Sequence, residues 1–225
     1  KYLGVVQISV QDIEADDGIA YLCGMFEGHR KVVVSSDKDM WQLVNDTTSV
    51  YWPTKKVYIT TENFSEMSKF HRSNYVLARA ISGKGDTSDN VHGIKGLGDK
   101  TIEKIFPILL TSPMTLDELL AWVRERLERN EKGELDLKDT EKRWYATLLQ
   151  EQELVRRNVQ VMQLTSPIIS VNAAATIRHA ADEIKPEWNI TKFKLVLSNS
   201  GIQLVDQDLF VTFQEFRVRA KNATA

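Results

Sequence analysis

The chain has 225 residues, of which 42% are hydrophobic and 27% are charged, and this length suits one large domain or two small ones. Its apolar content is that of a globular protein, and no apolar run approaches membrane-spanning length, so we expect neither a membrane segment nor a signal peptide. The lone Cys23 cannot form an internal disulfide, which favours a reducing cytoplasm. The first residue is Lys1 rather than Met, from which we expect a fragment or a processed chain.

The formal net charge of −2 does not by itself indicate a nucleic-acid-binding protein. The acidic residues are unevenly spread, however, because seven of them fall in three short motifs: Glu14, Asp16, Asp17, Asp37, Asp39, Asp86 and Asp89. Without these seven, 24 acidic residues (31 − 7) remain against 29 basic residues, a balance of +5. Bound divalent ions would neutralise part of the acidic cluster. The net charge therefore neither excludes nor supports nucleic-acid binding.

The first third of the chain has the pattern of a βαβ unit. Residues 5–10 are β-branched and predict a strand, residues 14–28 have helical spacing and end at a glycine, and residues 31–36 predict a second, buried strand. Such a unit has parallel strands joined by a right-handed crossover. We therefore expect the first two acidic motifs at the carboxyl ends of the strands, where parallel sheets bind ligands.

The remaining elements are mainly helical. Residues 49–59 predict a hairpin at the sheet edge, and residues 64–81 predict one helix. Residues 115–118 form a capping box that opens a long helix, and a second long helix ends near Asn158. Two further helices are expected between residues 172 and 198. The pattern as a whole indicates an α/β protein with a helical C-terminal region.

A glycine-rich hairpin lies between the two halves. Gly93, Gly96 and Gly98 have the spacing G-x-x-G-x-G and precede a short segment of helical periodicity. Glycine permits tight turns and close approach of a ligand to the backbone, and the amides at the start of a following helix suit a phosphate. Glycines are equally typical of a plain loop between helices, and that alternative stays open.

Each acidic motif also has a purely structural alternative. The acids at 14–17 could favour the dipole of a helix, Asp37 and Asp39 could form a turn, and Asp86 and Asp89 could cap a helix. The conjunction of three such motifs favours a cation site, because neighbouring carboxylates repel one another unless cations neutralise them. Oxygen ligands select hard cations such as Mg²⁺ or Mn²⁺, and the scattered histidines argue against a zinc site.

Three stretches carry a family resemblance: Ile13-Glu-Ala-Asp-Asp17, Ser35-Ser-Asp-Lys-Asp39 and Gly85-Asp-Thr-Ser-Asp-Asn-Val-His-Gly-Ile-Lys-Gly-Leu-Gly98. In order and spacing they resemble the consecutive motifs of the flap endonuclease (5′ nuclease) superfamily, in particular the bacteriophage 5′–3′ exonuclease/ribonuclease H group and the 5′-nuclease domain of bacterial DNA polymerase I. The family's first motif, of Asp-Gly-Asn type, and its basic arch are not found in this sequence. The resemblance thus covers the later part of the nuclease core.

The resemblance implies a fold and a division of the chain. It implies a partial parallel-sheet nuclease core of the PIN-like type at residues 1–82. A helix–three-turn–helix DNA-binding element follows at 83–106, then a helical region at 107–200 and a C-terminal tail at 201–225. It also implies hydrolysis of phosphodiesters near 5′ ends, flaps and RNA primers, with two Mg²⁺ (or Mn²⁺) ions as cofactors.

The resemblance assigns roles to individual residues. The matching ligands of the first ion are Glu14, Asp16, Asp17 and Asp37, and those of the second are Asp39, Asp86 and Asp89. Catalysis rests on Asp16, Asp17, Asp37 and Asp39. The hairpin glycines Gly93, Gly96 and Gly98 match the family's DNA-binding element, which often holds a K⁺ ion by backbone carbonyls. We expect phosphate contacts from Lys84, Lys95, Lys100 and Lys104, although each lysine alone is more typical of a solvated helix face.

The expected partner is DNA, as a 5′ flap, a duplex junction or an RNA–DNA hybrid, together with single-strand-binding or other replication proteins, in the cytoplasm of the host if the protein is phage-encoded. Two alternatives stay open. One is a DNA-binding module without catalysis, because the first metal-ligand motif is missing. The other is a replication scaffold that docks through Phe210, Phe213 and Phe216.

Overall fold

The computed structural model describes residues 4–86, 89–183, 187–202, 211 and 214–215. Two compact units make up the chain: Lys1–Glu14 with Ile169–Ala225, and Ala15–Ile168. The expected segment boundaries at 82/83 and 106/107 both fall inside the second unit. The phenylalanines of the expected docking tail, at 210, 213 and 216, lie outside the described residues.

The second unit contains a three-stranded sheet in the order β1-β2-β3. Strand β1 (Lys31–Val34) pairs in parallel with β2 (Thr48–Trp52), and β2 pairs antiparallel with β3 (Val57–Ile59). Val33, Val50 and Ile59 share a register and are buried on one face of the sheet. The sheet and the helices confirm the α/β fold class, and the hairpin expected at residues 49–59 is present.

The expected strand at Val5–Val10 is wrong. These residues are irregular, and Val5 is 57% exposed. They belong to the first unit, whereas the parallel partner of β1 is β2, reached through the 3₁₀ helix η1 (Asp39–Leu43). The β-branched composition of a segment does not make a strand unless neighbouring strands pair with it.

An aromatic cluster fixes η1, the element that carries Asp39. Trp41 stacks on Tyr75 with ring centroids 5.8 Å apart and meets Phe64 edge-on at 6.3 Å. All three rings are buried in the core under the sheet. Because aromatic packing of this kind holds the backbone rigidly, the start of η1 has a defined position.

The helix expected at residues 64–81 is three elements: α2 (Phe64–Ser68), η2 (Arg72–Asn74) and α3 (Tyr75–Ile81). The chain leaves α2 at Lys69, whose φ of 73° is left-handed. Asn74 is fully buried and donates hydrogen bonds to the carbonyls of Leu109 and Ser112. These bonds fix the start of α3, so tertiary contacts decide where the helix begins.

The glycine hairpin runs from the end of α3 to α4 (Asp99–Ile105), which α5 (Ile108–Thr111) follows. Two backbone hydrogen bonds tie the hairpin to its entry: Gly83 donates to Leu97, and Ile94 donates to Ile81. Ile94 and Leu97 are buried in the helical core. The hairpin is therefore a packed element rather than a solvated loop.

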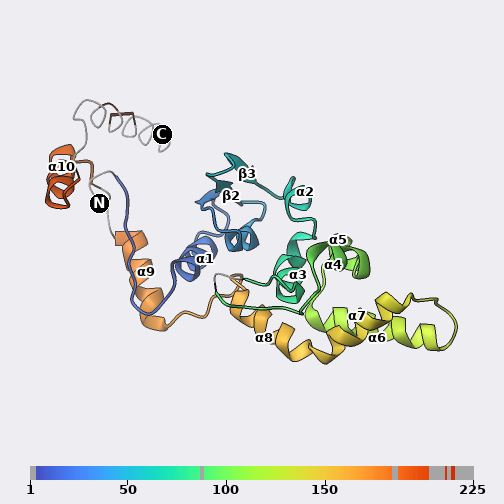
Figure 1. Cartoon of the computed structure of the whole chain (residues 1–225). Helices are drawn as coiled ribbons and strands as arrows, with labels where there is room; N and C mark the ends of the chain where they lie inside the picture. The colour runs from blue at the N-terminus through green and yellow to red at the C-terminus, as the bar shows by residue number, and fades with distance from the viewer. Residues whose placement is uncertain (1–3, 87–88, 184–186, 203–210, 212–213, 216–225) are drawn as a thin grey trace. The chain divides into compact units, whose positions relative to one another are not determined.

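Three long helices complete the second unit: α6 (Leu116–Glu131), α7 (Asp139–Gln150) and α8 (Gln152–Met162). The capping box of Thr115 and Glu118 is present at the start of α6. The second long helix is divided at Glu151, between α7 and α8, and α8 packs beside α3 (Figure 1). The first unit adds α9 (Val171–Glu183) and α10 (Ile190–Asn199). None of the described helices is both long and apolar enough to cross a membrane.

Replacing Asn158 by Leu should destabilise the second unit. Asn158 lies on α8, is 4% exposed, and donates to the carbonyl of Ala80 in α3 at 3.2 Å and to that of His92 in the hairpin at 2.9 Å. Leucine leaves both carbonyls without this donor, so we expect a loss of about 2 kcal/mol in the free energy of unfolding. Urea denaturation measures it. The exposed Gln160 on the same helix supplies the control Gln160→Leu. Equal effects of the two changes would contradict a stabilising role for the two hydrogen bonds of Asn158.

Candidate metal centre and nucleic-acid interface

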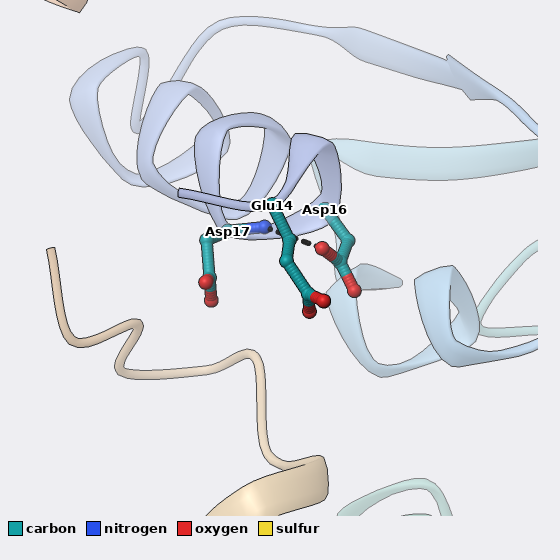
Figure 2. Close-up of side chains that lie close together, drawn as sticks. All are labelled: Glu14, Asp16 and Asp17. Atoms are coloured by element: carbon teal, nitrogen blue, oxygen red, sulfur yellow. Dashed lines mark hydrogen bonds between the residues drawn. The ribbon is translucent and has the colours of Figure 1, made fainter. Parts of the chain in front are cut away.

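The first acidic group lies at the start of α1 (Ala15–Met25). Glu14 directly precedes the helix and Asp16 and Asp17 form its first turn, and each offers a carboxylate oxygen within 4.8 Å of the other two (Figure 2). The Asp17 amide donates to Asp16 Oδ1 at 3.1 Å. Partial burial, and then the charge of Asp16, raises the pKa of Asp17.

The second acidic group joins segments that are distant in the sequence. Asp39 comes from the start of η1, and Asp86 and Asp89 come from the hairpin, with carboxylate oxygens within 4.8 Å of one another. Asp39 and Asp86 are each only 7% exposed. Asp86 and Val91 exchange two backbone hydrogen bonds of 2.8 Å, which close the turn that carries Asp89. The hairpin and η1 together thus bring three carboxylates into one compact group.

Charge connects the two groups. Burial, and then the charge of Asp86, raises the pKa of Asp89. The charges of Asp16 and Asp37 raise the pKa of Asp89 further. Carboxylates of all three motifs thus contribute to the negative charge around Asp89, a repulsion that bound cations would relieve.

Asp37 lies in neither of the three-carboxylate groups. Its Oδ1 accepts a hydrogen bond from the Asp39 amide at 2.8 Å, and its own amide donates to Ser35 Oγ. Asp37 therefore orders the turn from β1 into η1, as the structural alternative for this motif expected. Its charge also raises the pKa of the buried Tyr75 hydroxyl, after burial itself. Asp37 thus has a turn-forming role and also contributes charge to the acidic region.

Arg79 is a residue of this site that the motifs do not include. Its side chain leaves α3 and forms ion pairs with Asp39 through Nη1 and with Asp86 through Nη2, the latter at 2.8 Å. The sequence does hold a signal: Arg79 is the one charged residue of α3, whose remaining residues are otherwise apolar or aromatic. A lone charge in a buried helix usually has a buried partner.

The donor chemistry of both groups fits a hard divalent cation. All six side chains are carboxylates, and each set of three is compact enough to share one ion. Oxygen donors of this kind suit Mg²⁺ or Mn²⁺ and offer nothing to a soft ion. The acidic clusters therefore support the use of a divalent metal.

The hairpin glycines differ in why glycine is needed. A Cβ on Gly93 would lie 2.1 Å from the Ser82 carbonyl oxygen, and a Cβ on Gly85 would lie 2.0 Å from that of Val91. Gly96 has a φ of 83°, which other residues rarely adopt. A Cβ on Gly98 would meet no atom of the described residues within 4 Å. The fold itself thus requires glycine at 85, 93 and 96, whereas the described part of the chain leaves room for a side chain at 98.

The four expected phosphate-binding lysines are exposed, and they lie on the hairpin and on α4: Lys84, Lys95, Lys100 and Lys104. Lys84 forms an ion pair of 3.7 Å with Asp99, both side chains being well exposed. Such surface pairs contribute little stability, so the Lys84 ammonium can exchange this partner for a phosphate. The hairpin and α4 thus offer four exposed ammonium groups to a ligand.

Comparison with known proteins finds relatives among 5′-3′ exonucleases and bacterial DNA polymerases I. Residues 1–69 match the family described as the 5′-3′ exonuclease N-terminal resolvase-like domain. The chain is 36% identical over 124 residues to a 5′-3′ exonuclease of Bacillus subtilis, covering 52% of this chain and 40% of that protein. It is 30% identical over 131 residues to the thermostable DNA polymerase I of Thermus thermophilus, covering 56% of this chain and 15% of the polymerase.

Solved structures share the fold. A bacteriophage T5 5′-exonuclease with bound divalent zinc ions aligns with a TM-score of 0.55 at 19% identity, over 77% of this chain and 56% of that chain. A T5 flap endonuclease in a pseudo-enzyme–product complex with DNA and metal ions aligns with a TM-score of 0.53 at 20% identity. This chain thus spans about two fifths of the curated exonuclease and just over half of the T5 enzymes. The chain is thus similar in sequence to 5′-3′ exonucleases and to bacterial DNA polymerase I over about half of its length, and it shares the fold of the T5 enzymes.

Proposed function

We propose that this chain carries the metal centre and the DNA-binding hairpin of a structure-specific 5′ nuclease that uses two Mg²⁺ or Mn²⁺ ions. The observation that carries the proposal is the assembly of two compact carboxylate groups from motifs as far apart as residues 14 and 89. Isolated acidic motifs have structural explanations, but these do not account for two such groups that influence each other's charge.

We assign the carboxylates to the two ions by their positions in the structure. Glu14, Asp16 and Asp17 would hold one ion, and Asp39, Asp86 and Asp89 would hold the other, while Asp37 orders the turn that leads from β1 to Asp39. When bound, two such ions activate a water molecule and stabilise the leaving oxygen of a phosphodiester. No side-chain nucleophile is needed, so the carboxylates serve as ligands and as acceptors of hydrogen bonds from that water.

The substrate we propose is DNA near a 5′ end: a 5′ flap, a duplex junction or an RNA–DNA hybrid such as a primer. The exposed lysines of the hairpin and α4 support contacts to phosphates, and such contacts position a protein on DNA without reading the base sequence. A K⁺ ion at the hairpin, replication proteins as partners and a cytoplasmic location belong to the same proposal. A relative of this fold has been solved with DNA and metal ions, which supports the substrate class.

A cleavage assay tests the proposal. A labelled 5′-flap duplex is incubated with the complete gene product in Mg²⁺, in Mn²⁺ and in EDTA, beside a 3′-flap duplex of the same sequence. We expect cleavage of the 5′ flap only, in either metal and not in EDTA. Binding of the 5′ flap without any cleavage would favour the non-catalytic DNA-binding alternative and overturn the nuclease proposal.

Replacing Lys95 by Ala should change how binding depends on salt. If the Lys95 ammonium neutralises one phosphate, its loss reduces the slope of log affinity against log salt by about one unit. The measurement is binding of the 5′-flap duplex in EDTA at several salt concentrations. Lys132→Ala is the matched control, because Lys132 is exposed at the far end of α6. An unchanged slope for Lys95→Ala would remove this lysine from the interface.

A further inference from the structure

Arg79 connects two of the carboxylates of the second acidic group. Its two terminal nitrogens reach different carboxylates, Asp39 of η1 and Asp86 of the hairpin. The side chains of Asp39 and Asp86 are 10% and 8% exposed, and that of Arg79 is 22% exposed. A single guanidinium thus links two buried carboxylates from elements that no backbone pairing joins.

The charges explain why this link forms. Asp39, Asp86 and Asp89 carry a charge of −3 within a few ångströms of one another when all are ionised, and Arg79 reduces it to −2. Two buried carboxylates without a cation repel each other. The guanidinium offsets this repulsion and links Asp39 to Asp86 while no other cation is present.

The same guanidinium opposes a divalent ion. An ion shared by the three carboxylates would lie close to a positive group that is already in contact with two of them, and like charges repel strongly where solvent is largely excluded. Arg79 also orders the ligands, which favours ion binding. This contribution is small, because burial already holds Asp39 and Asp86 and backbone hydrogen bonds hold Asp86. The electrostatic opposition is therefore the larger effect.

We propose that Arg79 is a built-in counter-cation of the Asp39–Asp86–Asp89 group, which stabilises the group without metal and competes with a divalent ion for it. The inference deepens the proposed function, on which it rests for the identity of the ion. Arg79 is a positioning residue in this account, since it acts through the carboxylates. A phosphodiester bound nearby would add negative charge and so favour the divalent ion over the guanidinium. Occupancy of the second group would then depend on substrate.

Titration of Mn²⁺ into the complete gene product, without DNA, tests the proposal by calorimetry. One guanidinium beside a carboxylate commonly shifts its affinity for a proton by about one to three orders of magnitude. We expect Arg79→Gln to bind Mn²⁺ at this group at least about tenfold more tightly than the wild type. We also expect it to have a lower melting temperature in EDTA and a larger rise on addition of Mn²⁺. Equal or weaker Mn²⁺ binding by Arg79→Gln would overturn the proposal.

Three further variants make the result specific. Arg79→Lys keeps the charge and should keep the weak affinity, which also covers the case in which Arg79→Gln folds poorly. The double variant Arg79→Gln/Asp39→Asn should lose the gain in affinity, because the gain acts through Asp39. Arg72→Gln removes an arginine that donates to the Val44 carbonyl, and Mn²⁺ should not selectively restore its stability. Tight binding by Arg79→Lys, or a gain that persists in the double variant, would contradict the proposal.

These measurements separate the inference from the proposed function. A wild type that cleaves no 5′ flap, beside an Arg79→Gln variant with tighter Mn²⁺ binding, would overturn the nuclease proposal and leave the counter-cation role standing. Normal cleavage with no effect of Arg79→Gln on Mn²⁺ affinity would overturn the counter-cation role and leave the nuclease proposal standing.

Discussion

Replacing Asp16 by Asn is expected to reduce single-turnover cleavage of a 5′-flap duplex by at least about 100-fold, with little change in DNA affinity. Asp16 contributes a carboxylate to the first acidic group, and its charge also acts on Asp89 of the second. Asparagine keeps the shape of the side chain but removes the charge that attracts a divalent ion. Asp16 is not among the lysines and glycines that we propose to contact DNA, so the two effects can be measured separately.

The measurement is a single-turnover assay at limiting Mg²⁺, combined with binding of the same duplex in EDTA. Asp46→Asn is the control, because it makes the same change in net charge at an exposed residue outside both groups. Near-normal turnover of Asp16→Asn would show that Asp16 is not a ligand. An equal loss in Asp46→Asn would show that general electrostatics, rather than the site, controls cleavage.

Replacing Gly93 by Ala should cost about 3 kcal/mol in the free energy of unfolding. The new Cβ would lie 2.1 Å from the Ser82 carbonyl oxygen and 2.8 Å from that of Ala80. Both are backbone atoms, which cannot move aside without displacing the hairpin from α3. Because the hairpin carries Asp86 and Asp89, Mn²⁺ affinity should fall as well.

Gly98→Ala is the matched comparison, because a Cβ there meets no atom within 4 Å in the part of the chain that the structure describes. Its stability should stay within about 0.5 kcal/mol of the wild type. Its affinity for the 5′-flap duplex should nevertheless fall, if the backbone at Gly98 approaches a phosphate as proposed. Urea denaturation and DNA binding of both variants decide the matter. A stable Gly93→Ala protein would contradict the packing described for the hairpin, and an unchanged affinity of Gly98→Ala would remove this glycine from the DNA surface.

The grouping of carboxylates could largely be predicted from the sequence. The motifs that contain Asp39, Asp86 and Asp89 were expected to supply one ion, and the structure brings these three together. Asp37 was expected with the first group. In the structure it orders the turn into η1, and its role as a ligand stays a prediction. Spacing in a motif predicts which carboxylates share a region, but it does not predict which of them also bind a backbone amide.

Other features depended on tertiary contacts that no local pattern contains. Residues 5–10 have the composition of a strand and lack a pairing partner, so they are irregular. The helix expected at 64–81 is interrupted where Lys69 turns left-handed and the buried Asn74 binds two distant carbonyls. Arg79 was missed for the same reason: its partners are 40 and seven residues away in the sequence, and only the folded chain brings both to it.

The location of bound cations tests the central claim most directly. Crystals of the protein grown with Mn²⁺ and a 5′-flap product, with data collected at the manganese absorption edge, would place each ion by its anomalous signal. The account predicts one ion at Glu14, Asp16 and Asp17 and another at Asp39, Asp86 and Asp89, separated by about 3.5–4 Å as in other two-metal sites. Manganese found only away from these carboxylates, with both groups empty, would contradict it.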